Sequence, residues 1–141
     1  MSQIQEMIKP AAAMLDTYPV VTTKKKTKQW IKTCVPGMTP EKVERYSWPQ
    51  ALLAMGLLQA YEQTKDKTAL SSVFSYLRRW KNSGYPISHV DHVMNGSVAL
   101  WTEEILTREK REDAESLEAL WICREGADIC AGWIKAAKKT A

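Results

Sequence analysis

The sequence predicts an all-α protein built from stacked helical hairpins, and three observations lead to this prediction. No segment alternates apolar and polar residues with the period of two expected of a strand. Two largely apolar segments are each followed by a short polar turn and a one-sided amphipathic segment. Trp48 and Asp91, at the starts of these apolar segments, lie 43 positions apart. A repeat of about this length is typical of stacked helical hairpins.

The strongest helix is predicted from about Trp48 to Thr64. Its first three turns carry almost no polar residue, which predicts burial on all sides. Ser47 and Gln50 have the spacing of a capping box, and Pro49 is tolerated in the first turn. Gly56, inside this helix, predicts close approach by a neighbouring backbone.

Three more helices follow in the same way. Asp66 is predicted to cap the second helix, which is polar on its exposed face. The third helix opens at His89-Val90-Asp91-His92. The fourth runs from about Asp113 to Lys139, and Gly126 and Gly132 weaken it enough for a break. At the offset of 43, the apolar positions of the two hairpins coincide: Leu57 with Leu100, and Leu77 with Leu120.

The first third of the chain gives weaker signals. Apolar spacing predicts an amphipathic helix over residues 4–15, with a kink or restart at Pro10. A short helix is predicted from Gln29 to Cys34, ended by Pro36-Gly37. Thr39-Pro40-Glu41 has the pattern of another helix start.

The bulk composition is that of one globular domain over residues 1–141, with 45% hydrophobic and 26% charged residues. No apolar run is long enough to span a bilayer and no signal-peptide core is present, so we expect a cytoplasmic protein without a membrane partner. The net charge of +4 is concentrated at Lys24, Lys25, Lys26 and Lys28. This cluster is either a solvated loop or a site for an anionic partner; without a nucleic-acid module, we expect no nucleic acid.

The three cysteines predict reduced, buried thiols rather than a disulfide. Cys123 and Cys130 share the last predicted helix, about 10 Å apart along its axis, which is too far for a disulfide. Cys34 lies far away in the sequence.

Three segments carry a resemblance to a known family. They read Tyr46-Ser47-Trp48-Pro49-Gln50, Tyr61-Glu62-Gln63-Thr64-Lys65-Asp66 and Val90-Asp91-His92-Val93-Met94-Asn95-Gly96. Together they resemble the N-terminal part of the unsaturated glucuronyl and rhamnogalacturonyl hydrolases, glycoside hydrolase families 88 and 105. The Asp-His-x-x-x-Gly stretch is the most specific piece, and the resemblance covers roughly Met14 to Thr140.

The resemblance implies an (α/α)6 toroid and hydrolysis of unsaturated uronyl oligosaccharides left by pectin-type polysaccharide breakdown. In that family an aspartate protonates the 4,5 double bond, and water then adds to the neighbouring carbon. By the motif, Asp91 matches an auxiliary carboxylate that contacts the uronate ring. The resemblance further implies substrate-binding roles for Tyr46, Trp48 and His92, and it implies no cofactor.

The chain departs from the family at the principal catalytic aspartate, which follows a Trp beyond the third hairpin. Residues 108–141 contain only Asp113 and Asp128 as aspartates, neither in a matching context. Six hairpins of this period need about 260 residues. We therefore expect an incomplete toroid, about half of the barrel, that lacks hydrolase activity. Its uncovered apolar flanks predict self-association.

Each site residue also has a structural interpretation. Asp91 could simply cap its helix, and Trp48 could pack in the core. Trp80, Trp101, Trp121 and Trp133 lie on helical stripes and are predicted core residues. A metal site at His89, Asp91 and His92 is disfavoured because it lacks a clear third neutral ligand.

Two functions therefore remain open. One is a hydrolase-family fragment that binds uronyl oligosaccharides, which requires Tyr46, Trp48 and Asp91 to line one concave mouth. The other is a helical-repeat interaction module without catalysis, for which the basic cluster would matter.

Overall fold

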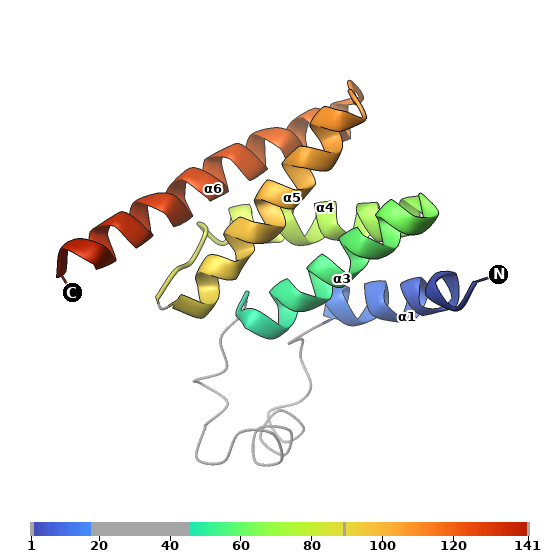
Figure 1. Cartoon of the computed structure of the whole chain (residues 1–141), viewed down its shortest axis with the longest axis horizontal. Helices are drawn as coiled ribbons and strands as arrows, with labels where there is room; N and C mark the ends of the chain where they lie inside the picture. Colours follow the sequence, from blue (N-terminus) through green and yellow to red (C-terminus); the bar gives the residue numbers. More distant parts are fainter. Residues whose placement is uncertain (1, 18–45, 89, 141) are drawn as a thin grey trace, which may run out of the picture.

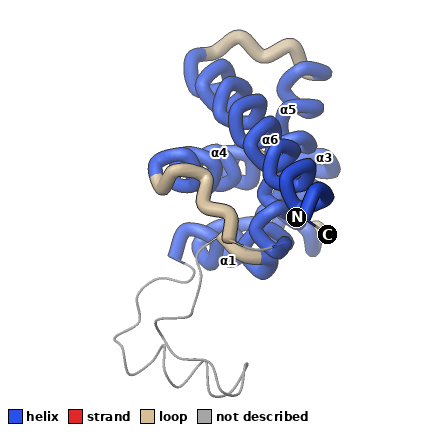
Figure 2. The backbone as a smooth tube through the Cα atoms, turned by 90° about the vertical axis from the view of Figure 1, so that its left-hand side faces the viewer, coloured by secondary structure: helices blue, strands red, loops and turns tan. Residues whose placement is uncertain are grey.

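The computed structural model describes residues 2–17, 46–88 and 90–140, and this part of the chain is all-α. Its elements are α1 (Gln3–Thr17), α3 (Trp48–Thr64), α4 (Lys67–Asn82), the 3-10 turn η2 (Val90–Val93), α5 (Met94–Arg108) and α6 (Ala114–Thr140). Within the described residues there is no strand (Figure 2). The predicted all-α class is confirmed.

Two helical hairpins lie side by side. α3 and α4 form the first and α5 and α6 the second, with α3 against α5 and α4 against α6. The inner helices α3 and α5 begin at the same end of the molecule, and α4 and α6 run back (Figure 1). α1 packs on both α3 and α4, so the stack runs from α1 through the α3–α4 hairpin to the α5–α6 hairpin.

The core is centred on α4, which is packed from both sides. Tyr76, Leu77 and Trp80 of this helix are almost fully buried. The Trp80 ring meets Tyr85 edge-on, with ring centroids 4.9 Å apart. A Cβ added at Gly126 would lie only 2.4 Å from the Trp80 ring, so glycine is what allows α6 to pass over this tryptophan.

The two predicted helix caps have different outcomes. Asp66 is the N-cap of α4 and its side chain accepts a hydrogen bond of 2.9 Å from the Thr68 amide, as predicted. Ser47 is the N-cap of α3 but makes no side-chain bond to the helix amides. Its hydroxyl instead donates to Gln50 Oε1 at 3.3 Å, and Gln50 is buried. The predicted capping box is therefore wrong.

The prediction that α3 is buried on all sides is also wrong. Trp48 and Leu52 are 50% and 49% exposed. Gly56 is exposed as well, and a Cβ added there would meet nothing within 4 Å. The close approach expected at Gly56 occurs instead at Gly126 and at Gly96, where an added Cβ would lie 3.0 Å from the Cys130 side chain.

Several smaller expectations are corrected by the packing. α1 continues through Pro10, and α6 is a single helix of 27 residues despite its two glycines. Leu57 is buried but its repeat partner Leu100 is 59% exposed, so the sequence repeat does not extend to burial. Trp121 is 55% exposed and is not a core residue.

Other expectations are confirmed or lie outside the described residues. Trp80 is in the core, and Cys123 and Cys130 are buried free thiols. Burial raises the pKa of Cys123 to about 12, which makes this thiol a poor nucleophile. The predictions for residues 18–45, including Cys34 and the lysine cluster, and for His89 fall outside the described part of the chain.

A polar cluster fastens the hairpin turns at the end opposite the starts of α3 and α5. The Tyr61 hydroxyl donates to Glu109 Oε1 at 2.7 Å, and Lys65 Nζ lies 3.0 Å from Glu109 Oε2. Arg111 Nη1 donates to the Tyr61 hydroxyl at 3.3 Å. Burial works to raise the pKa of Glu109, but the hydrogen bonds from Tyr61 and Lys65 outweigh it and hold the pKa below the ordinary value of 4.5.

Replacing Glu109 by Gln keeps the acceptor oxygen but removes the charge. Because the folded-state pKa of Glu109 lies below its unfolded value, its stabilisation is present at neutral pH and is lost as the pH falls below 4.5. We expect Glu109→Gln to be less stable than the wild type at pH 7 in urea unfolding, and the difference to shrink in acid. Glu112→Gln, at an exposed position in the same turn, is the control and should cause little change at either pH.

Two glycine substitutions separate packing from helix propensity. In Gly126→Ala the new methyl group would clash with the buried Trp80 ring, which should lower the free energy of unfolding by about 1–3 kcal/mol. The higher helix propensity of alanine offsets part of this loss. Gly56→Ala, in open space, should be neutral or stabilising by up to about 1 kcal/mol. Equal effects of the two substitutions in urea unfolding would contradict this packing of α6 on α4.

Candidate functional site

The starts of α3 and α5 are joined by a single buried side chain, Asn95. Its Nδ2 donates to the Tyr46 carbonyl at 2.5 Å and to the His92 carbonyl at 3.1 Å. Its Oδ1 accepts a hydrogen bond from the Tyr76 hydroxyl of α4. Since Asn95 is fully buried, these contacts hold the segment before α3, the turn η2 and α4 in one fixed arrangement. Trp48 and Asp91 therefore lie at the same end of the molecule, as the offset of 43 predicts.

Tyr46 lies in the core at this end. It is 8% exposed, its hydroxyl is 3.0 Å from Ser83 Oγ, and its ring centroid is 5.7 Å from that of Tyr76. Its φ of 63° is in the left-handed region, which turns the chain into α3. The exposed aromatic wall expected at Tyr46 is therefore not formed: the ring packs inside and presents no open face to a sugar.

His92 is buried too, at 3% exposure. Its Nδ1 accepts a hydrogen bond of 2.9 Å from the Ser88 amide, which fixes the ring behind the turn η2. With this burial, His92 supports the turn that carries Asp91, and the expected direct contact of His92 with substrate is not available in this conformation.

Trp48 and Asp91 are the two predicted site residues that reach the surface. Trp48 is half exposed, and Asp91 is partly exposed on η2. Trp48 lines a shallow apolar hollow of about 400 Å³ with Met14, Pro49, Leu52 and Leu53. All of these residues come from α1 and α3, so the two site residues share an end of the molecule but Asp91 does not line this hollow.

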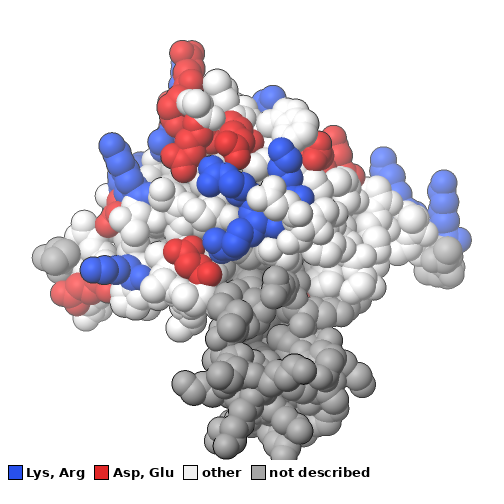
Figure 3. Space-filling view, turned by 180° about the vertical axis from the view of Figure 1, so that it is seen from behind, with Lys and Arg blue, Asp and Glu red and all other residues white. Residues whose placement is uncertain are grey.

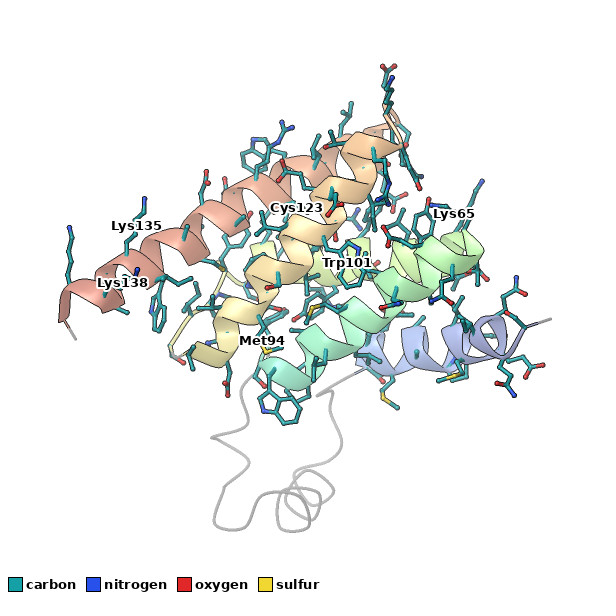
Figure 4. All side chains as sticks on the ribbon, viewed as in Figure 1. Lys65, Met94, Trp101, Cys123, Lys135 and Lys138 are labelled. Carbon is teal, nitrogen blue, oxygen red and sulfur yellow. The ribbon has the colours of Figure 1, made fainter. Side chains whose placement is uncertain are left out.

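The buried polar residues around Asn95 were missed by sequence reasoning. Asn95 belongs to the Val-Met-Asn-Gly stretch that carries the family resemblance, but its spacing alone assigns it no role. Tyr76 lies on the apolar stripe of α4, and burial raises its pKa, so its hydroxyl stays protonated as the donor to Asn95. Met94, next to Asn95, marks the start of α5 beside the start of α3 in Figure 4.

The described residues set limits on the chemistry of this end. They contain no group of His, Cys, Asp and Glu side chains arranged to hold a metal ion. None of the helices in the described part of the chain is long and apolar enough to cross a membrane. Among the predicted site residues, the groups that reach the surface at this end are the Trp48 indole and the Asp91 carboxylate.

Comparison of the chain with protein families, with curated proteins and with solved structures finds no match in any of the three. The family resemblance in the three motif segments therefore stays a prediction, and the function is argued from the site itself.

Asn95→Asp tests whether one side chain joins the two helix starts. The carboxylate has the same shape but cannot donate to the Tyr46 and His92 carbonyls, and it would be buried without a counter-charge. We expect a loss of about 2–4 kcal/mol in the free energy of unfolding, with faster amide exchange in residues 46–50 and 90–95. Asn82→Asp, at the exposed end of α4, is the matched control. A stability equal to that of wild type would contradict the role of Asn95.

Proposed function

We propose that this chain is part of an α/α toroid of the unsaturated uronyl hydrolase type, and that it binds uronyl oligosaccharides at the end where α3 and α5 begin. The observation that carries this proposal is the Asn95 link, which brings Trp48 and Asp91 to one end on a rigid support. A toroid of this type collects the starts of its inner helices at one rim, and the two inner helices described here share that arrangement.

The two exposed groups suit a sugar. An indole ring offers a flat apolar face against which the C–H face of a pyranose packs. A carboxylate accepts hydrogen bonds from neighbouring sugar hydroxyls, and bonds to a charged acceptor are the stronger kind. In this proposal Trp48 supplies the platform and Asp91 the acceptor, while Tyr46 and His92 hold them from behind.

We propose binding without turnover for these 141 residues. Protonation of the 4,5 double bond needs a carboxylic acid that keeps its proton at the working pH. Asp66 accepts the Thr68 amide as a helix cap, and Asp16 pairs with Arg79 at 3.6 Å. Asp113 is bonded to Ser116, which lowers its pKa and makes it a poorer proton donor. Of the other two aspartates, Asp91 is the proposed hydrogen-bond acceptor and Asp128 is exposed on α6. In this proposal, none of the five is the proton donor.

The proposal is tested by titrating an unsaturated uronyl disaccharide into the protein and following binding by calorimetry. Trp48→Ala and Asp91→Asn should each weaken binding by about tenfold or more, since each removes a contact worth about 1.4 kcal/mol. Trp121→Ala is the matched control, because Trp121 is equally exposed but lies on α6.

The same samples report on turnover through the ultraviolet absorbance of the double bond, which should stay constant. No binding by the wild type, or equal loss in the Trp121→Ala control, would overturn the proposed site. A fall in absorbance would show that a group within this sequence donates the proton.

One observation favours the alternative, a helical-repeat interaction module. The large exposed apolar side chains of the described residues lie on α1, α3, η2, α5 and α6, and none lies on α4. Such surfaces on a stack of hairpins are where further helices pack.

A further inference from the structure

The sequence has two asparagines, Asn82 and Asn95, and they lie in opposite surroundings. Asn82 precedes Ser83 at the exposed end of α4. Asn95 precedes Gly96 in the first turn of α5 and is fully buried. In an unfolded chain, an asparagine followed by glycine loses its side-chain amide most readily, because glycine has no Cβ to hinder attack by its own backbone nitrogen. The residue that joins the starts of α3 and α5 is therefore also the more reactive asparagine of the unfolded chain.

The loss of this amide is an intramolecular reaction that consumes only water. The Gly96 nitrogen attacks Cγ of Asn95, and the proton of the Gly96 amide passes to Nδ2 as the Cγ–Nδ2 bond breaks and ammonia leaves. The product is a cyclic succinimide. Water then adds to one of its two carbonyls and the ring opens, which leaves aspartate or isoaspartate at position 95. The net change replaces an amide by a carboxylic acid, which is ionised at neutral pH.

In the folded protein, three hydrogen bonds hold the Asn95 side chain. Its Nδ2 donates to the Tyr46 and His92 carbonyls, at 2.5 and 3.1 Å, and its Oδ1 accepts from the Tyr76 hydroxyl. Attack requires the two reacting atoms to align at about 3–3.5 Å, with Cγ turned towards the next backbone nitrogen. Turning the side chain breaks bonds made at both Nδ2 and Oδ1, and burial keeps water from the succinimide. The reaction therefore waits until this end of the molecule opens.

The attacking nitrogen is held as well, by contact with α6. Burial raises the pKa of the Cys130 thiol, and a hydrogen bond from the Gly96 amide to this thiol works in the other direction. A Cβ added at Gly96 would lie 3.0 Å from Cys130 Cβ and 3.2 Å from its Sγ, so the close approach of α6 requires a glycine here. Two packing needs thus produce the Asn-Gly pair: an amide that joins three segments, and a residue without a side chain beneath α6.

We propose that Asn95 is a site of spontaneous deamidation which the native fold protects, and that opening of the end where α3 and α5 begin lets the reaction proceed. The change is irreversible and falls on the link itself. A carboxylate at position 95 cannot donate to the two carbonyls, and burying its charge costs free energy, so this end does not close again in the same way. The proposal does not depend on the proposed sugar binding.

Asn82 provides an internal comparison. It is exposed, and the last turn of α4 also carries Arg79 and Lys81. Positive and negative side chains are already interspersed over the face of the molecule shown in Figure 3, and one more exposed charge on such a surface changes stability little. Deamidation of Asn82 therefore needs no opening of the core and should leave the fold intact.

The test follows both asparagines of the full chain during incubation at neutral pH, with and without guanidinium chloride. Peptide mapping by mass spectrometry measures the conversion of each amide to the acid. In denaturant, Asn95 should convert faster than Asn82. In the folded protein the order should reverse, and Asn95 should convert at least about tenfold more slowly than in denaturant, because only the open fraction of molecules reacts. Gly96→Ala should slow the conversion of Asn95 in denaturant and leave that of Asn82 unchanged.

A variant of the link gives the decisive result. Tyr76→Phe removes the donor to Asn95 Oδ1, so it should speed the conversion of Asn95 in the folded protein by about two- to tenfold and leave the rate in denaturant unchanged. The chain deamidated at Asn95, separated by ion exchange, should unfold at a lower denaturant concentration than the wild type, whereas the chain deamidated at Asn82 should not. Equal rates for Asn95 with and without denaturant would overturn the proposal. So would a Tyr76→Phe rate equal to that of the wild type, or wild-type stability after deamidation at Asn95.

Discussion

The described structure depends on the hydrogen bonds of Asn95. An amide side chain carries both donors and an acceptor, so a single buried residue satisfies two carbonyls and one hydroxyl from different parts of the chain. Without it, the Tyr46 carbonyl and the Tyr76 hydroxyl would be buried without a partner, at a cost of about 1–3 kcal/mol each. The position of Trp48 relative to Asp91 follows from this link, and with it every functional argument about this end of the molecule.

The sequence predicted the helices well because their signals are local. The 3.6-residue period and the cap at Asp66 depend only on residues near one another in the chain, and the 43-residue offset compares two such local patterns. The glycines were predicted poorly because their role depends on a neighbour from elsewhere. Gly56 and Gly126 look alike in the sequence, but only Gly126 faces a tryptophan, and that tryptophan comes from α4. The same reason explains why α3 is open on one side although its composition predicts burial.

Within the candidate site, the division between exposed and buried residues could not be predicted either. Tyr46 and Trp48 are two positions apart and both aromatic, so composition and spacing treat them alike. Tyr46 is buried because two residues supply partners for it. Tyr76 of α4 contacts its ring, and Ser83 at the end of α4 lies within hydrogen-bond distance of its hydroxyl. Among the described residues, Trp48 lies beside apolar side chains of α1 and of its own helix, and it stays half exposed. Tertiary neighbours, and not residue type, decided which aromatic residue is available to a ligand.

The hairpin geometry adds an electrostatic consequence to this end of the molecule. Because α6 runs antiparallel to α5, the C-terminal turns of α6 return to the end where α5 begins (Figure 1). Lys135 and Lys138 of these turns therefore lie towards the end where α3 and α5 begin (Figure 4). Under the proposed function, an anionic uronate approaching that end would meet a positive potential that offsets repulsion from the Asp91 carboxylate. Exposed charges interact over about 8–10 Å at physiological salt. In the proposed function, the lysines would therefore act on the approach of the ligand, and the indole and the carboxylate would make the direct contacts.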